Sequence, residues 1–163
     1  MRFSSNFGTA IHTLLIIGEF SKTQKVTSDV IADHLGTNPV LVRNLLGMLK
    51  KAGFISIAPR KDKAGTTLAR PLCQITLFDV FEAVEPTYLQ DLNGSSTRLA
   101  RRSHTGIFAN EIIFEYVRIA VDAVRDEYGK VTLADTLTAL EIKEAQCPHD
   151  NPRALFHAEN QKS

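Results

Sequence analysis

The residues with the clearest chemistry are Arg43 and Asn44, two neighbours that can each form hydrogen bonds with a DNA base. Val40 precedes them, and Lys50 and Lys51 follow. Arginine can donate two hydrogen bonds to a guanine, asparagine can pair with an adenine, and a valine can pack on a thymine methyl group. The lysines come a turn or more later and suit phosphate oxygens. This combination is typical of a helix that enters the major groove of double-stranded DNA. A solvated helix face with ordinary charges is the alternative.

The elements that must position these residues favour the first interpretation. Asn38 can cap a helix whose first position is Pro39, and Gly53 can end it. Its buried stripe is predicted to be Leu41, Leu45, Met48, Leu49 and Ala52. Asn38 then joins the outward residues that we expect to contact DNA.

A short helix precedes this one, with Thr27 or Ser28 as its cap and Gly36 as its left-handed stop. Before it, apolar residues at helical spacing from Phe3 to Phe20 predict an amphipathic first helix. Ser4, at the start of that helix, could bond to a phosphate through its hydroxyl, although a plain cap is equally consistent with the sequence. Two short helices joined by a tight turn predict a helix-turn-helix.

A basic hairpin is predicted next, with strands at 54–57 and 66–69 and a turn-forming loop between them. We expect this hairpin to be a wing that enters a minor groove or follows the phosphate backbone. Its candidate DNA contacts are Arg60, Lys61, Lys63, Gly65 and Thr66.

The formal charge of +1 hides a strong partition along the chain. Residues 37–70 contain seven Lys and Arg against one Asp, a net charge of +6, whereas residues 71–163 carry −5 and residues 1–36 are neutral. A basic centre beside an acidic C-terminal half predicts that one part of the molecule contacts phosphates and another part avoids them.

The segment 107–128 predicts a long helix with two different apolar contacts. Glu111, Glu115, Arg118, Asp122, Arg125 and Asp126 fall within a sector of about 100°, and almost all of the remaining circumference is apolar. An arc that wide implies packing on its own domain and on a second subunit, hence a homodimer. The residues expected at the dimer interface are Ile112, Ile113, Tyr116, Val117, Ala120 and Val124. Burial of the helix wholly within one chain is the alternative.

The chain has two cysteines, Cys73 and Cys147, and no apolar run near eighteen residues. We therefore expect a cytoplasmic protein with reduced thiols and no membrane partner. Cys73 is expected to be a small buried residue, with a redox sensor as the alternative. The scattered histidines and the sparse Cys147-Pro148-His149 fragment predict no metal site, no cofactor and no enzyme active site.

The sequence resembles the Rrf2 family of small bacterial transcription regulators over about residues 2–140. The resemblance is carried by the run from Asn38 to Leu46, by Leu49-Lys50-Lys51-Ala52-Gly53-Phe54-Ile55, and by the helix that follows Ile75-Thr76-Leu77. Cluster-binding members of the family have three cysteines before the long helix, whereas residues 85–107 here contain none. The chain therefore resembles a cluster-free member, whose signal would be a thiol reaction, a small molecule or a protein.

Together these observations predict a mainly α fold. A winged helix-turn-helix DNA-binding domain with a two-stranded β-wing would occupy 1–84, a connector 85–106, dimerisation helices 107–142 and a loose tail 143–163. The resemblance implies a dimeric regulator, a repressor in our interpretation, that binds a palindromic operator through the third helix and the wing. The alternative is a winged-helix module that has lost DNA binding and holds a protein instead.

Overall fold

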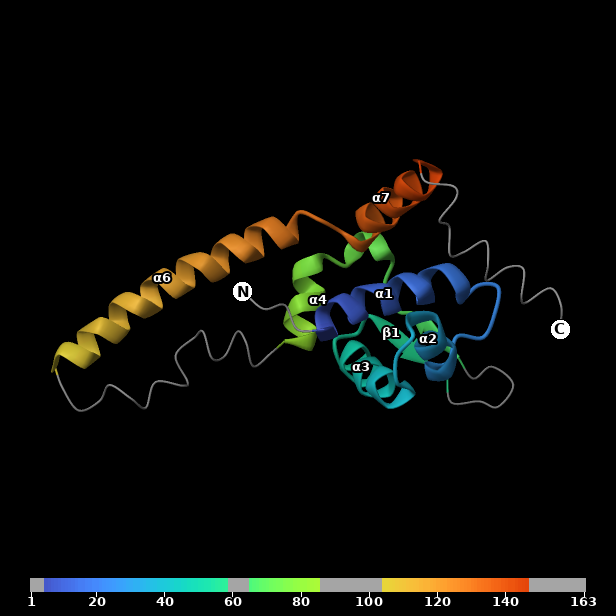
Figure 1. Ribbon diagram of the computed structural model, residues 1–163, viewed down its shortest axis with the longest axis horizontal. Helices are drawn as coiled ribbons and strands as arrows, with labels where there is room; N and C mark the ends of the chain where they lie inside the picture. Colours follow the sequence, from blue (N-terminus) through green and yellow to red (C-terminus); the bar gives the residue numbers. More distant parts are fainter. Residues whose placement is uncertain (1–4, 59–64, 86–103, 147–163) are drawn as a thin grey trace.

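The computed structural model describes residues 5–58, 65–85 and 104–146. The elements in chain order are α1 (Ser5–Phe20), α2 (Ser28–Leu35), α3 (Pro39–Lys51), β1 (Ile55–Ile57), β2 (Thr66–Leu68), the 3-10 turn η1 (Leu72–Gln74), α4 (Leu77–Val84), α6 (His104–Gly129) and α7 (Leu133–Gln146). The short elements gather into one body, and α6 runs outward from it, with its N-terminal end farthest away (Figure 1).

The predicted helix ends are confirmed at both helices of the helix-turn-helix. The Thr27 hydroxyl accepts a hydrogen bond from the Val30 N–H at 3.3 Å, and the Asn38 side chain accepts one from the Val40 N–H at 2.8 Å. Between them Gly36 has a φ of 58°, a left-handed conformation that favours glycine. These local features fix where α2 begins and ends and where α3 begins.

The wing has the predicted antiparallel pairing, with Ile55 opposite Leu68 and Ile57 opposite Thr66. Arg70, which follows the hairpin, donates from Nη2 to the Ala52 carbonyl at 3.0 Å, and its guanidinium lies 4.8 Å from the centre of the Phe54 ring. Arg70 therefore joins the wing to the C-terminal end of α3, where a positive charge is favourable. Arg70 thus counts toward the positive charge of residues 37–70, but its guanidinium makes contacts within the domain.

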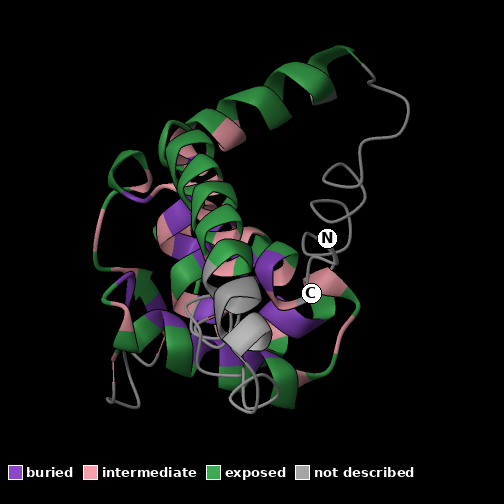
Figure 2. Ribbon diagram, turned by 90° about the vertical axis from the view of Figure 1, so that its left-hand side faces the viewer, coloured by how far each residue is buried: buried purple, intermediate pink, exposed green. Residues whose placement is uncertain are grey.

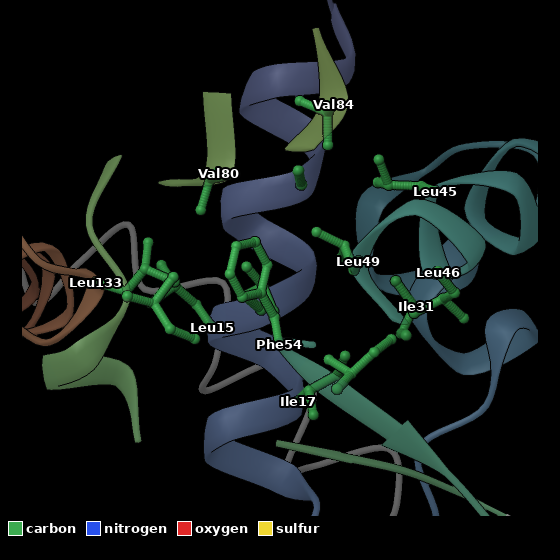
Figure 3. Packing of buried hydrophobic residues seen from close by; sticks show 14 of the residues in the cluster. Leu15, Ile17, Ile31, Leu45, Leu46, Leu49, Phe54, Val80, Val84 and Leu133 are labelled. Atoms are coloured by element: carbon green, nitrogen blue, oxygen red, sulfur yellow. The ribbon is translucent and has the colours of Figure 1, made fainter. Parts of the chain in front are cut away.

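The hydrophobic core surrounds α1, with side chains from α3, α4, the strand segment and the start of α7 converging on it (Figure 3). Leu14 and Ile17 of α1 are fully buried. The stripe on α3 differs from the prediction. The buried residues are Val42, Leu45, Leu46 and Leu49, whereas Leu41 and Met48 are exposed. The buried stripe is therefore shifted around the helix toward Val42 and Leu46, because this is the side of α3 that packs on the body.

One polar group in this core has no partner. The Thr13 hydroxyl, on a fully buried residue in the middle of α1, makes no hydrogen bond within the described part of the chain. A buried hydroxyl without a partner is unfavourable by about 1–3 kcal/mol. We expect Thr13→Val, which keeps the shape and removes the hydroxyl, to raise the midpoint of thermal unfolding measured by circular dichroism. Thr13→Ser, which keeps the hydroxyl but loses a methyl group, should lower it; a lower midpoint for Thr13→Val would contradict this account.

Two capping boxes meet where the C-terminal helices join the body. Thr76 and Asp79 form a capping box at the start of α4, and Thr132 and Asp135 form one at the start of α7. Hydrogen bonds from the Thr132 hydroxyl and N–H lower the pKa of the Asp135 carboxyl. The two cap residues pair as an antiparallel bridge, which places Leu133 fully inside the core.

Two predicted boundaries are corrected by the helices. The long helix begins at His104 rather than 107, and α7 continues to Gln146, beyond the predicted end at 142. Lys143 to Gln146 are good helix formers that precede Pro148, so the helix runs on until a residue that disfavours it approaches. The remainder of the predicted connector, 86–103, and the tail from 147 lie outside the described residues.

Candidate nucleic-acid interface

The face of α3 opposite the core is exposed along its whole length. The residues on it are Val40, Arg43, Asn44, Gly47, Lys50 and Lys51, all of them exposed. Because Val42, Leu45, Leu46 and Leu49 face the core, the polar and basic side chains are left to solvent by the packing of the helix itself. The structure thus brings together on one surface the α3 residues that the sequence predicted as DNA contacts.

Arg43 is held by the start of α2. Its Nε donates to the Ser28 hydroxyl and its Nη2 to the Asp29 carboxylate, each at 3.3 Å. Both side chains of the ion pair remain largely exposed, at 57% for Arg43 and 69% for Asp29. Sequence reasoning missed Ser28 and Asp29, because they lie about fifteen residues from Arg43 and only the α2–α3 packing brings them to it.

Asn38 has a structural use that limits its chemistry. Its side-chain oxygen accepts the hydrogen bond that caps α3. The amide nitrogen is then the group that an exposed Asn38 can offer to a phosphate or a base.

The wing is described only in part. Arg60, Lys61 and Lys63, like Ser4, lie outside the described residues. Gly65 is half-buried beside Lys25 and Val26, and its carbonyl accepts from the Ala58 N–H at 3.1 Å.

Thr66 requires a correction. It is only 3% exposed, and its N–H donates to the Val26 carbonyl at 2.8 Å. The pairing register places it opposite Ile57 with its side chain toward the interior, so it is not available for DNA. We omit it from the proposed interface.

The long helix α6 carries two apolar arcs that differ in burial. Figure 2 shows that the described part of α6 is mostly exposed, with some intermediate positions. At about 100° per residue, one arc is half-buried and runs through Phe114, Val117, Val121, Val124 and Tyr128. Tyr128 stacks on Phe7 at 5.7 Å between ring centres. The other arc is exposed and consists of Ile112, Ile113, Tyr116, Ile119, Ala120 and Ala123. We call this second set the α6 exposed arc.

The predicted dimer residues lie on both arcs. Ile112, Ile113, Tyr116 and Ala120 are on the exposed arc, whereas Val117 and Val124 are on the half-buried one. The two arcs adjoin on the helix, so the prediction from periodicity did not separate them.

Cys73 lies in η1 and is exposed, which corrects the expectation of a buried residue. The short turn that follows Pro71 carries its side chain outward. Cys147 lies outside the described residues. Among the residues that are described, no three His, Cys, Asp or Glu side chains gather as a metal site, and no helix is long and apolar enough to cross a membrane.

Comparison with known proteins decides the family. The family model of Rrf2, described as an iron-dependent transcriptional regulator, matches residues 3–139 of this chain. The chain belongs to the Rrf2 family. Rrf2 proteins are transcriptional regulators rather than enzymes, in agreement with the prediction that this chain is not an enzyme.

Two similar proteins support the assignment. YwnA of Bacillus subtilis (strain 168), a candidate HTH-type transcriptional regulator, is 37% identical over 82 residues, which cover 50% of this chain and 58% of YwnA. The match therefore spans little more than half of that relative. A candidate transcriptional regulator from Lactobacillus plantarum, known from a crystal structure, has a TM-score of 0.67 and 26% identity over 89% of this chain and 95% of its own.

A third similarity concerns the fold alone. IscR of T. potens superposes with a TM-score of 0.62 at 19% identity, covering 88% of this chain and 91% of IscR. The predicted mainly α, winged helix-turn-helix fold is confirmed by these Rrf2-type neighbours.

The donor set of this chain does not fit the iron chemistry in the family's description. Iron–sulfur clusters are held mainly by cysteine thiolates, commonly four of them. This chain has two cysteines in all, and residues 85–107 contain none. The described residues offer no alternative cluster of ligands around Cys73.

Proposed function

We propose that this Rrf2 protein is a dimeric regulator that binds DNA sequence-specifically through the exposed face of α3, with the wing as a second contact. The observation that carries the proposal is the surface of α3. One helix face presents Arg43, which can donate to guanine, together with the Asn44 amide, the apolar Val40 and two lysines. No carboxylate in the described part of the chain forms an ion pair with Lys50 or Lys51. A helix of this composition beside a hairpin suits the major groove.

The α6 exposed arc supports the dimer. Ile112, Ile113 and Ile119 are each 56% exposed and Tyr116 is 70% exposed, all on one side of a projecting helix. A continuous apolar stripe of this kind marks an interaction surface, and a second copy would supply the same stripe by two-fold symmetry. Two copies of α3 would then read a palindromic operator. A repressor that blocks a promoter is the mode of action that we propose.

The proposed signal that controls DNA binding belongs to one of the three classes predicted from the sequence: a small molecule, a protein or a thiol reaction. Cys73 is exposed and therefore accessible to an oxidant, and it keeps its place as the candidate redox residue.

The proposed DNA binding is tested by its dependence on salt. Sites would be selected from randomised duplexes with the purified protein, and affinity measured by fluorescence anisotropy at increasing KCl. We expect affinity to fall steeply, and we expect Lys51→Ala to weaken all sequences alike and to reduce the logarithmic salt slope by about 1.

Lys130→Ala is the matched control, because it removes the same charge from an exposed lysine at the end of α6, away from α3 (Figure 1). It should leave affinity and slope unchanged. Failure to select any sequence, or binding that does not respond to salt, would instead favour a module that holds a protein.

A further inference from the structure

The contacts of Arg43 assign a role to the start of α2. The guanidinium has two edges that can make paired hydrogen bonds, and the edge formed by Nε and Nη2 faces Ser28 and Asp29. The other edge is formed by Nη1 and the second N–H of Nη2, and the hydrogen bonds and ion pair of Arg43 with the described residues do not involve Nη1. A guanine needs two parallel donors of this kind for its O6 and N7 atoms.

We propose that Ser28 and Asp29 are positioning residues that hold Arg43 for one base and thereby determine the base preference of α3. The inference rests on the proposed function, since it names how that same surface discriminates among sequences. Arginine has a long, flexible side chain, and holding it before DNA arrives lowers the ordering that binding must supply. Two acceptors on adjacent residues orient the plane of the guanidinium, which one acceptor would leave free to rotate.

A purely structural role explains these contacts less well. An exposed ion pair with both partners more than half accessible contributes little to folding stability. The α2–α3 pair is already held by the buried Ile31, Ala32, Val42 and Leu46. The contact therefore has a larger effect on the direction of Arg43 than on the stability of the domain.

The negative charge of Asp29 also opposes nonspecific DNA binding. A carboxylate on the surface of a DNA-binding helix pair repels phosphates, so it opposes contacts that any sequence could make. By retaining one edge of Arg43, it makes this arginine less able to serve as a general phosphate contact. Both effects widen the difference between the preferred site and all others.

The test uses Asp29→Ala and a matched control, Asp33→Ala. Asp33 lies one turn further along the same helix, is exposed, and is not a hydrogen-bond or ion-pair partner of Arg43, so the control removes the same charge from α2. Duplexes selected by the wild-type protein would be varied at each base pair. Arg43→Ala would first identify the base pair whose preference depends on Arg43.

At that base pair we expect Asp29→Ala to reduce discrimination between the preferred base and its substitutes by about fivefold or more. Ser28→Ala should reduce it to a smaller extent, and Asp33→Ala should leave it unchanged. In an Arg43→Ala background, Asp29→Ala should have no further effect on discrimination. Thermal unfolding of each variant would show that the folded state is retained.

The outcomes separate the inference from the function on which it rests. If the wild-type protein discriminates and Asp29→Ala discriminates equally well, the inference is wrong while the proposed function stands. Tighter specific binding by Asp29→Ala with undiminished discrimination would likewise overturn it, because Asp29 would then merely compete with DNA for Arg43. If the wild-type protein selects no sequence, both are overturned.

Discussion

The double substitution Ile112→Asp with Tyr116→Asp is expected to convert a dimer into a monomer. Both residues lie on the α6 exposed arc, one turn apart, and are 56% and 70% exposed in a single chain. Since neither belongs to the core, the monomer should fold normally. Two carboxylates on each copy would face one another across a two-fold interface, where unpaired charges are strongly unfavourable.

The expected change is large in two measurements. Sedimentation equilibrium at micromolar concentration should give twice the 18.0 kDa chain mass for the wild-type protein and the single chain mass for the variant. Affinity for a selected two-half-site duplex should fall by about 100-fold or more, because the second half-site is no longer tethered.

Arg118→Asp provides the control for this experiment. It lies on the polar sector of the same helix, is exposed, and makes the same change of two charge units. It should remain dimeric. A wild-type protein that sediments as a monomer, or a double variant that stays dimeric, would show that the exposed arc has another use.

A second large effect is expected from Leu133→Ala, which should lower stability by about 2–5 kcal/mol. Leu133 is fully buried although it begins the last helix, and its N–H donates to the Ile75 carbonyl at 2.9 Å. The Leu77 N–H donates to the Val131 carbonyl at the same distance, so the junction is bonded on both sides. Removing the leucine side chain leaves a cavity at the point where α6 and α7 are anchored.

Leu140→Ala is the comparison for Leu133→Ala. It removes the same atoms from the same helix, but Leu140 is 37% exposed. Thermal melts at one protein concentration should show a drop of about 5–15 °C for Leu133→Ala and a much smaller one for Leu140→Ala. Equal drops would mean that the junction does not hold the C-terminal helices to the body.

The anchoring of Leu133 also explains why the predicted division of the chain is incomplete. Sequence patterns separated a domain at 1–84 from helices at 107–142, because a gap in periodicity lies between them. Leu133 and Tyr128 nevertheless pack on core residues of the first segment, including Phe7 and Phe81. Contacts between residues so far apart in the chain leave no local pattern to detect.

The sequence by itself determined the local elements. Thr27, Asn38, Thr76 and Thr132 each act as the cap that their residue type predicts, and Gly36 ends α2. These features depend on hydrogen bonds between residues two to four positions apart, so they can be predicted without knowing the fold. The basic charge of residues 37–70 and the wide apolar arc of α6 are likewise properties of the residues in order.

Only the tertiary structure decided which side of each element is used. It rotated the buried stripe of α3 onto Val42 and Leu46, turned Thr66 inward and Cys73 outward, and divided the α6 arc into a half-buried and an exposed part. It also placed Ser28 and Asp29 against Arg43. Burial and side-chain pairing depend on which distant surfaces meet, and periodicity along the chain cannot specify that.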